Sequence, residues 1–295
     1  MKKTGIFYHE IIGKKADPLA REVEAGFRIL EKENLFAEPN IFLFESQPVE
    51  EELILQIHPK HRIEEVKRMG YYEVSLYSIG GLVKATEKVL NREIDNALVL
   101  LGAGGHHAHR DWAWGGCYFN TDAIPIEYAR ERFGTRKFAI VDTDTHHADG
   151  TRDIFKADEE VLHICYCQSF GYNYWGYNYG SRIETKTKVC FPQANSDEEF
   201  IERLEKEVPP RITDFKPELI YWVCGMDTHK HGYGTKKLTE ACYPELAKII
   251  KKVTDEVCSS KLIARTGCNI PGYPSAVEYI IPRLVDCLAE LNKYI

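Results

Sequence analysis

Short, nearly continuous apolar runs alternate along the chain with amphipathic stretches. Runs of this kind are typical of strands that are covered on both faces. Strands are predicted at 5–8, 41–44, 97–101, 138–141, 161–166, 219–224 and 262–264, and helices at 17–34, 77–91, 123–133, 198–207, 240–258 and 276–292. The alternation predicts an α/β fold with a doubly wound, mostly parallel sheet. No repeat or linker interrupts it, so we expect a single domain over residues 1–295.

Three local patterns refine this picture. Ser196, followed three residues later by Glu199, predicts a capping box at the start of the fourth helix. The segment 169–181 is rich in Tyr, Asn and Gly and predicts a loop. An aromatic surface loop and an aromatic wall around a site fit that segment equally well. Trp112 and Trp114 fit either the rim of a channel or the packing of a loop.

Composition narrows the class of protein. Of the 295 residues, 44% are hydrophobic and 28% are charged, which is typical of soluble globular proteins. No apolar run reaches the ~18–20 residues of a membrane helix, and the first ten residues lack the apolar core of a signal peptide. We therefore expect a cytoplasmic protein without a membrane partner. Forty-five acidic and 38 basic residues give a net charge of -7, which disfavours nucleic acid and permits a cationic small substrate.

The nine cysteines are odd in number, scattered, and without a Cys-x-x-Cys pair. Several lie in apolar, strand-like stretches, as Cys165 does. We expect reduced, buried thiols in a reducing compartment rather than disulfides or a structural zinc knuckle.

Polar and glycine-rich clusters follow four of the predicted strands. They occupy residues 102–107, 142–150, 225–229 and 265–269. Loops after the carboxyl ends of parallel strands converge on one edge of a sheet, where ligands bind in open α/β folds. The sequence therefore predicts a single site at that edge.

Asp144-Thr145-His146 is an Asp-x-His pair in the second of these clusters. In an extended segment, residues two apart point the same way, so a carboxylate and an imidazole can share one ion. Asp227, after another strand, would complete a set with open positions, as in catalytic rather than structural zinc sites. Salt bridges or hydrogen bonds are the alternative for the Asp-x-His pair alone.

His106 and His107 form a glycine-flanked tandem pair at the end of a neighbouring strand. A neutral imidazole near an activated water is a good general base, and a carboxylate partner sets its tautomer and basicity. Asp142 and Asp149 flank the Asp-x-His pair and are the expected partners. Two purely structural loop histidines are the alternative.

These stretches resemble a known family. Residues 104–108, 115–120 and 141–151 closely resemble motifs of the histone deacetylase and acetylpolyamine amidohydrolase family. Residues 225–229 are similar to its third metal-ligand motif, and residues 57–82 resemble its N-terminal half. The resemblance implies the arginase/deacetylase α/β fold and hydrolysis of acyl amides with a divalent metal, usually zinc.

The resemblance implies which residues hold metal ions. Asp144, His146 and Asp227 would bind the catalytic metal. Zn²⁺ is expected, with Fe²⁺, Co²⁺ and Mn²⁺ as alternatives, because carboxylate and imidazole ligands suit all four. The family also binds a structural potassium ion, for which Asp142, Asp144 and His146 are candidate ligands.

The resemblance also implies which residues take part in catalysis. His107 would be the main general base and acid, and His106 its electrostatic companion. Asp142 would pair with His106, and Asp149 with His107. Gly115 would offer its carbonyl in the substrate channel.

The sequence departs from the family pattern at two positions. Cys268, before Asn269, stands where the family has a tyrosine that polarises the scissile carbonyl. A thiol is a poor donor, and losing one oxyanion donor costs about 10²–10³ in rate. Gly116 replaces an aromatic residue, so we expect one channel wall to be missing. Tyr273, or a tyrosine from residues 172–179, is a candidate to compensate for these losses.

Three roles for Cys268 stay open: it leaves a larger pocket, it ligates the metal, or it stands beside another hydroxyl that acts. The sequence predicts a metal-dependent amidohydrolase that hydrolyses a small acylated amine or an acyl-lysine-like group through metal-activated water and a histidine base. The alternatives are a catalytically weakened metal-binding or regulatory protein and an arginase-like binuclear ureohydrolase. The latter needs further carboxylates near Asp227, where the chain offers His229 and His231.

Overall fold

The structure is a computed structural model and describes residues 1–167 and 185–294. Within these residues one eight-stranded sheet has the order β2-β1-β3-β8-β7-β4-β5-β6. Every neighbouring pair of strands is parallel. The strands are β1 (Thr4–Tyr8), β2 (Ile41–Glu45), β3 (Asn96–Val99), β4 (Phe138–Asp142), β5 (Val161–Cys167), β6 (Lys188–Pro192), β7 (Leu219–Cys224) and β8 (Leu262–Thr266).

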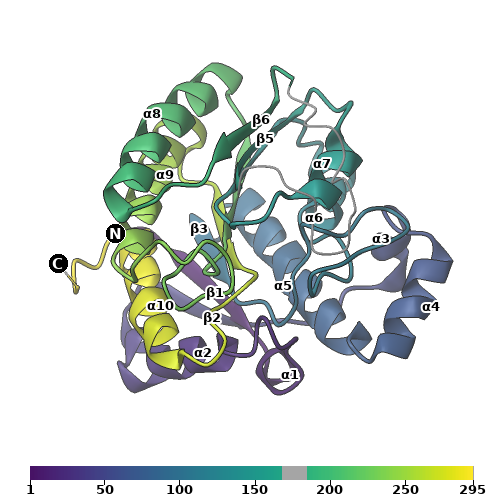
Figure 1. Cartoon of the computed structure of the whole chain (residues 1–295), viewed down its shortest axis with the longest axis horizontal. Helices are drawn as coiled ribbons and strands as arrows, with labels where there is room; N and C mark the ends of the chain where they lie inside the picture. The colour runs from purple at the N-terminus through teal and green to yellow at the C-terminus, as the bar shows by residue number, and fades with distance from the viewer. Residues whose placement is uncertain (168–184, 295) are drawn as a thin grey trace.

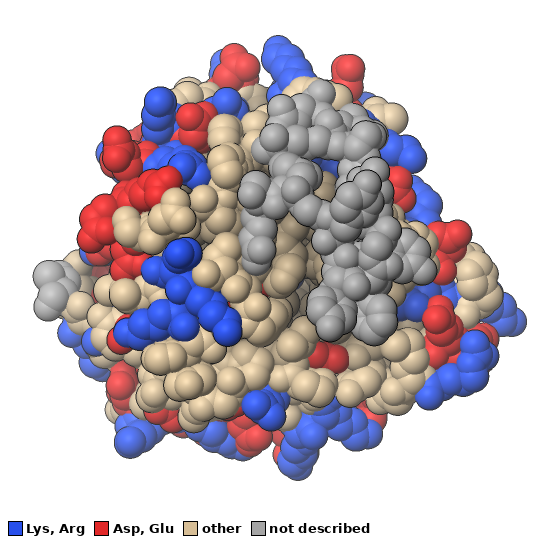
Figure 2. Space-filling model, in the orientation of Figure 1, with Lys and Arg blue, Asp and Glu red and all other residues tan. Residues whose placement is uncertain are grey.

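Helices cover both faces of the sheet, with α2, α8, α9 and α10 on one side and α3 to α6 on the other (Figure 1). Their bounds are α1 (Glu10–Lys14), α2 (Val23–Lys32), α3 (Glu51–Leu55), α4 (Lys60–Met69), α5 (Tyr72–Leu90), α6 (Ala123–Phe133), α7 (Asp149–Phe155), α8 (Asp197–Phe215), α9 (Cys242–Cys258) and α10 (Pro274–Ala289), with a short 3₁₀ helix η1 (Leu35–Ala37). On the face drawn in Figure 2, charged side chains of both signs are interspersed mainly around the periphery.

The continuous apolarity of the strands follows from this layering. Successive side chains of a strand point to opposite faces, and both faces are covered. In β3, Leu98 packs into the core beneath α2, α9 and α10, while Val99 packs into the core beneath α5 and α6. In β7, Trp222 packs into the same core as Leu98, and Tyr221 into the same core as Val99. The predicted doubly wound parallel sheet is confirmed, and all of its pairings are parallel.

All seven predicted strands are present, but the edge strand β6 was missed. Its sequence mixes Lys188 with apolar residues and ends at Pro192, so it does not read as a buried strand. The structure nevertheless buries Lys188, because its ammonium donates to the carbonyls of Asp158 (2.8 Å) and Val161 (2.5 Å).

The helix predictions were less accurate at their bounds. The helix expected over 17–34 begins only at Val23, and α8 continues through two internal prolines to Phe215. The helices α1, α3, α4 and α7 were not predicted. At the start of α8 the Ser196 hydroxyl accepts the Glu199 N–H at 3.2 Å, as the capping box predicts. None of the described helices is long and apolar enough to cross a bilayer. The predicted loop 169–181 lies outside the described residues.

Candidate active site

The polar loops that follow the strands meet at the carboxyl edge of the sheet, as the sequence predicts. β4 ends at Asp142, the loop that leads to α7 carries Asp144 and His146, and Asp149 is the first residue of α7. β7 is the neighbour of β4 in the sheet. Gly225 follows β7, and a Cβ there would lie 2.5 Å from the Cα of Asp144. A glycine at this position therefore lets the two loops touch.

Asp144, His146 and Asp227 form a compact group of ligand atoms, all within 4.8 Å of one another. His146 Nδ1 lies 3.1 Å from Asp144 Oδ1 and 2.8 Å from Asp227 Oδ2. Both carboxylates are buried. Burial and the charge of Asp144 raise the pKa of Asp227 to about 6, because two buried carboxylates repel each other. A divalent cation would relieve that repulsion, so the residues fit a metal.

Hydrogen bonds from its own backbone hold the loop that carries Asp144 and His146. The Asp144 N–H donates to Asp142 Oδ1 (3.0 Å), and the His146 N–H donates to Asp144 Oδ1 (2.8 Å). The Gln193 side-chain amide donates to the Asp144 carbonyl at 3.0 Å. These bonds fix the carboxylates before any ion binds. The potassium ion that the resemblance implies at this loop stays a prediction.

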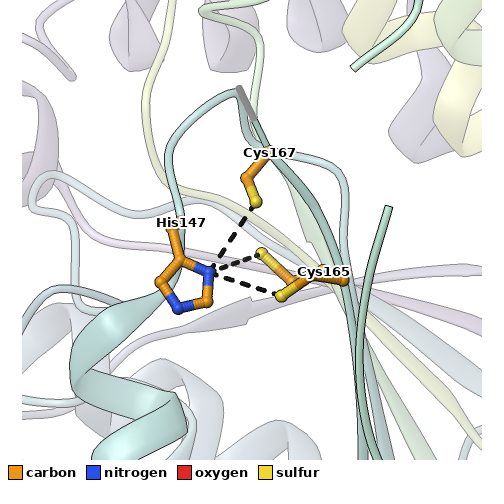
Figure 3. Close-up of side chains that lie close together, drawn as sticks. His147, Cys165 and Cys167 are labelled. Carbon is orange, nitrogen blue, oxygen red and sulfur yellow. Dashed lines mark hydrogen bonds between the residues drawn. The ribbon is translucent and has the colours of Figure 1, made fainter. Parts of the chain in front are cut away.

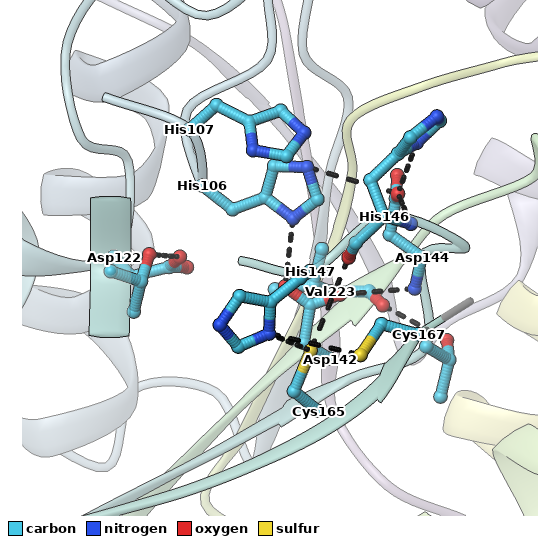
Figure 4. A network of polar contacts seen from close by, with 12 residues as sticks. His106, His107, Asp122, Asp142, Asp144, His146, His147, Cys165, Cys167 and Val223 are labelled. Atoms are coloured by element: carbon cyan, nitrogen blue, oxygen red, sulfur yellow. Dashed lines mark hydrogen bonds and ion pairs between the residues drawn. The ribbon is translucent and has the colours of Figure 1, made fainter. Parts of the chain in front are cut away.

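The structure brings each tandem histidine together with the carboxylate expected for it. His106 Nδ1 lies 2.9 Å from Asp142 Oδ2 (Figure 4). His107 Nδ1 lies 2.6 Å from Asp149 Oδ1. An ionised carboxylate can only accept hydrogen bonds, so each imidazole carries a proton on Nδ1. The Nε2 atom of His107 is then the nitrogen that can accept a proton.

The two neighbouring imidazoles differ in their protonation. Burial and the charge of His106 lower the pKa of His107 to about 3, against the opposing effect of Asp149. For His106, burial also lowers the pKa, but the carboxylates of Asp144 and Asp142 outweigh it and raise the value to about 9. In the metal-free protein at neutral pH, His107 is therefore a neutral imidazole and His106 a cation.

A model of the histone deacetylase domain matches residues 67–280. The chain belongs to the histone deacetylase family. The motifs that carried the resemblance at the sequence level lie within the matched range, apart from the first part of the N-terminal region.

Curated relatives agree with this assignment, and a solved structure shares the fold. A probable deacetylase from Archaeoglobus fulgidus is 29% identical over 286 residues, covering 88% of this chain and 79% of the relative. A histone deacetylase-like amidohydrolase from Pseudomonas aeruginosa is 29% identical over 204 residues, covering 62% of this chain and 53% of the relative. The crystal structure of the HDA15 HD domain shares the fold, with a TM-score of 0.85 and 18% identity over 99% of this chain and 91% of the other.

Cys268, which the resemblance leads us to expect at the position of the family's tyrosine, is buried in the loop after β8. Burial raises the pKa of its thiol well above the usual value. Next to the thiol lies the hydroxyl of Tyr233. This hydroxyl is buried and makes no well-formed hydrogen bond with any residue that the structure describes. The ring of Tyr233 stacks on His146 at 5.7 Å between ring centres.

Tyr233 was missed at the sequence level, although a signal was present in Gly232-Tyr233-Gly234. A Cβ at Gly232 would lie 2.3 Å from the Asp227 carbonyl oxygen, and one at Gly234 would lie 2.2 Å from Thr145 Cγ2. The two glycines thus let this loop fold back over the candidate metal ligands and place Tyr233 there. Tyr273, the residue suggested instead, is 43% exposed and stacks on His231.

Trp114 supplies an aromatic surface beside His107. Its ring stacks on the His107 imidazole with 3.7 Å between centres, and its Nε1–H donates to Asp149 Oδ2 at 2.9 Å. Trp114 therefore lies within the site of this family member. Trp112 instead stacks on His109, a histidine that also approaches Asp149, at 3.4 Å from Oδ2.

Gly115 and Gly116 both have positive φ angles, 63° and 70°. A Cβ on Gly115 would lie 2.9 Å from His107 Cδ2, and one on Gly116 would lie 2.8 Å from Asp17 Oδ1. A larger side chain at either position would therefore meet these neighbours and strain the backbone. Trp114 is the aromatic residue that the structure places beside His107, and the missing channel wall expected at Gly116 stays a prediction.

A buried ion pair lies behind the site. Arg265 donates to both carboxylate oxygens of Asp122 at 2.9 Å, and Asp122 also accepts from the Thr151 hydroxyl at 3.0 Å. The pair joins the end of β8 to the residue before α6. Neither member of the pair was identified from the sequence.

A second group of potential metal ligands lies close to the first. His147, Cys165, Cys167 and Cys190 have ligand atoms within 4.8 Å of one another (Figure 3). The expectation of reduced, mostly buried cysteines is confirmed. Three cysteines that are scattered in the sequence nevertheless lie together in space, because β5 and β6 bring them side by side.

Proposed function

We propose that this chain is a metal-dependent amidohydrolase that removes the acyl group from an acylated amine. The observation that carries the proposal is the His107–Asp149 pair beside the ligand group of Asp144, His146 and Asp227. It combines a neutral, carboxylate-oriented imidazole with a group of residues suited to a divalent metal.

Zn²⁺ is the metal we propose, with Fe²⁺, Co²⁺ and Mn²⁺ as alternatives. Asp144, His146 and Asp227 would hold it, and three protein ligands leave positions open for water and substrate. When bound, such an ion lowers the pKa of a coordinated water and polarises an amide carbonyl.

His107 would take a proton from the attacking water at Nε2 and later return it to the leaving amine. Its pKa, which burial lowers, keeps it neutral and ready to accept at pH 7. Asp149, 2.6 Å from Nδ1, would stabilise the imidazolium that forms. His106, paired with Asp142 at 2.9 Å, would be the electrostatic companion of His107 beside the reacting carbonyl.

Tyr233 would supply the hydroxyl that the family's tyrosine supplies elsewhere. Its hydroxyl is buried beside Cys268 and lacks a well-formed hydrogen bond to a described residue, and its ring lies against the proposed ligand His146. A buried hydroxyl without a partner is costly, and a developing oxyanion would satisfy it. In this arrangement Cys268 leaves room for Tyr233.

The substrate we propose is a small acylated amine or an acyl-lysine-like group. His106 and His107 are only 3% and 2% exposed, so the amide bond must be carried to them on a slender chain. Trp114 and Gly115 flank His107 and are proposed to contact that chain. The excess of acidic residues favours a cationic amine.

The sequence also offers two alternatives to the amidohydrolase function. A metal-binding protein with weakened catalysis is favoured only by Cys268. An arginase-like binuclear site would use His229 and His231, but His229 Nε2 pairs with Glu240 at 3.1 Å and His231 stacks on Tyr273.

The test is His107→Ala, assayed on a panel of acetylated polyamines and acyl-lysine peptides together with metal analysis. We expect turnover to be abolished and the metal content to be unchanged, because a base is not a ligand. His61→Ala is the matched control, since His61 lies exposed on α4, and it should keep full activity. Loss of the metal in His107→Ala would make His107 a ligand and overturn the mechanism.

A further inference from the structure

Three cysteines and one histidine form a tight group on one face of the sheet, which we call the thiol cluster: His147, Cys165, Cys167 and Cys190. His147 Nδ1 lies 3.8 Å from the sulfur of Cys165, 3.7 Å from that of Cys167 and 3.5 Å from that of Cys190 (Figure 3). All three cysteines are buried.

The sheet itself assembles this cluster. Cys165 and Cys167 are two residues apart on β5, so their side chains point to the same face. Cys190 on β6 is the register partner of Cys165 and therefore shares that face. His147 lies in the loop after β4, just before α7, and reaches the thiols from above the strand ends.

We propose that the thiol cluster is a second metal site, which binds a structural Zn²⁺. A structural zinc site is closed by four tetrahedral ligands, and three thiolates with one imidazole are among its usual sets. Bond lengths of about 2.3 Å to sulfur and about 2.0–2.1 Å to nitrogen place tetrahedral ligand atoms about 3.6 Å apart between nitrogen and sulfur. The three observed separations of 3.5–3.8 Å match this spacing, and all four ligand atoms lie within 4.8 Å of one another.

The charge around the cluster also suits such an ion. Three thiolates with Zn²⁺ carry a net charge of −1, which is costly to bury alone. The guanidinium of Arg152 donates to the sulfur of Cys190 at 3.3 Å. Arg152 is itself only 4% exposed, and its Nε–H donates to His163 Nδ1 at 3.2 Å. A buried cation is therefore held against the thiols and would balance the loaded site.

The thiol cluster adjoins the loop that carries the proposed catalytic metal ligands Asp144 and His146. His147 directly follows His146, one of the proposed catalytic ligands, and the His147 carbonyl accepts the Asp149 N–H at 2.7 Å. A zinc ion here would tie the loop of residues 142–149 to β5 and β6 from behind. It would thus position Asp144, His146 and Asp149 without touching the substrate.

The proposal stands independently of the proposed function and can be tested separately. Zinc-loaded wild-type protein should contain about two zinc ions per chain, and Asp227→Ala should retain the one in the thiol cluster. X-ray absorption at the zinc edge should show a Zn–S distance of about 2.3 Å. Asp227→Ala should have about three sulfur ligands per zinc. The wild type should have about half as many on average, because only one of its two zinc ions is bound by sulfur. These measurements need no substitution in the thiol cluster.

Cys190→Ser should lose one of the two zinc ions, whereas the matched control Cys258→Ser, at a buried thiol at the end of α9, should lose neither. The proposal is overturned by zinc in Asp227→Ala with only nitrogen and oxygen neighbours, or by no zinc in that variant. Copper or iron bound at the sulfurs in place of zinc, or a disulfide between two of these cysteines, would overturn it as well.

Discussion

His146 and His147 are consecutive in the chain, yet their imidazoles belong to two different clusters. His146 Nδ1 lies 2.8 Å from Asp227 Oδ2, whereas His147 Nδ1 lies 3.5 Å from Cys190 Sγ. The chain bends at residues 144–146, so one short loop presents the two imidazoles to different groups of ligands. The short loop from Asp144 to Asp149 thereby connects the proposed chemistry to the strands behind it.

The first prediction concerns the hydroxyl donor. Tyr233→Phe should lower kcat/KM by about 10²–10³, because one oxyanion donor is lost, while metal content stays unchanged. Tyr273→Phe is the control and should keep its activity, since Tyr273 packs on His231 at the surface. Equal activity of Tyr233→Phe and the wild type would show that Tyr233 is not the donor.

The second prediction concerns Cys268. If Tyr233 acts in place of the family's tyrosine, Cys268→Tyr in a Tyr233→Ala background, which frees the space of the ring, should restore deacetylation of acetyl-lysine and acetylpolyamine substrates by one or more orders of magnitude relative to Tyr233→Ala alone. Cys268→Ala in the wild type should change activity little, because a buried neutral thiol donates weakly. A failure of Cys268→Tyr to restore activity, with the fold and metal intact, would place Cys268 outside the tyrosine position or indicate a rebuilt acyl pocket.

The third prediction is a pH dependence of stability at His58. This buried imidazole donates from Nδ1 to the Arg110 carbonyl (2.9 Å) and accepts the Asn120 N–H at Nε2 (2.9 Å), and burial lowers its pKa to about 4. The unfolded chain binds the proton near pH 6.5, so the free energy of unfolding should fall as the pH drops from 6.5 towards 4.

His58 should make its full contribution to the free energy of unfolding above pH 6.5. By pH 4 that contribution should have fallen by about 3 kcal/mol. Denaturant unfolding across this range should therefore show a steeper fall for the wild type than for His58→Gln. His61→Gln, at an exposed site on α4, should follow the wild type. Parallel curves for the wild type and His58→Gln would contradict the assignment.

The fourth prediction concerns the buried pair of Arg265 and Asp122. Arg265→Met should reduce the free energy of unfolding by about 3–5 kcal/mol, because it leaves a buried carboxylate without its cation. The double variant Arg265→Met/Asp122→Leu should recover much of that loss. Chemical denaturation of the three proteins measures both effects, and a double variant no more stable than the single one would show that the lost charge pairing is not the cause.

Much of the fold could be predicted from the sequence because both faces of the sheet are buried. Unbroken apolar runs as short as those of β3 and β7, bounded by polar and glycine-rich segments, favour buried parallel strands. The edge strand β6 was missed, because Lys188 is buried through hydrogen bonds to carbonyls that no local pattern reveals. α8 extends beyond its predicted end because Pro209 and Pro210 are tolerated within it.

Some residues of the candidate site could likewise be predicted from the sequence, and others could not. Asp142 and Asp149 could be named as partners of His106 and His107 because polar loops at strand ends converge on one edge of a sheet, whereas the resemblance supplied which carboxylate pairs with which histidine. Tyr233 could not be chosen, because its place depends on how the loop between its flanking glycines folds back. The thiol cluster could not be seen either, since it depends on the register of β5 against β6, which brings Cys190 opposite Cys165.

A metal held by Asp144, His146 and Asp227 at the site of amide hydrolysis is central to the proposed function. The most direct measurement is the release of free amine from acetylated polyamines and acyl-lysine peptides by zinc-loaded wild type and Asp227→Ala, with the metal content of each sample determined in parallel. We expect turnover by the wild type, and in Asp227→Ala the loss of both turnover and the metal of this site. Hydrolysis by Asp227→Ala, or no hydrolysis of any acyl amide by fully loaded wild type, would contradict the proposed function.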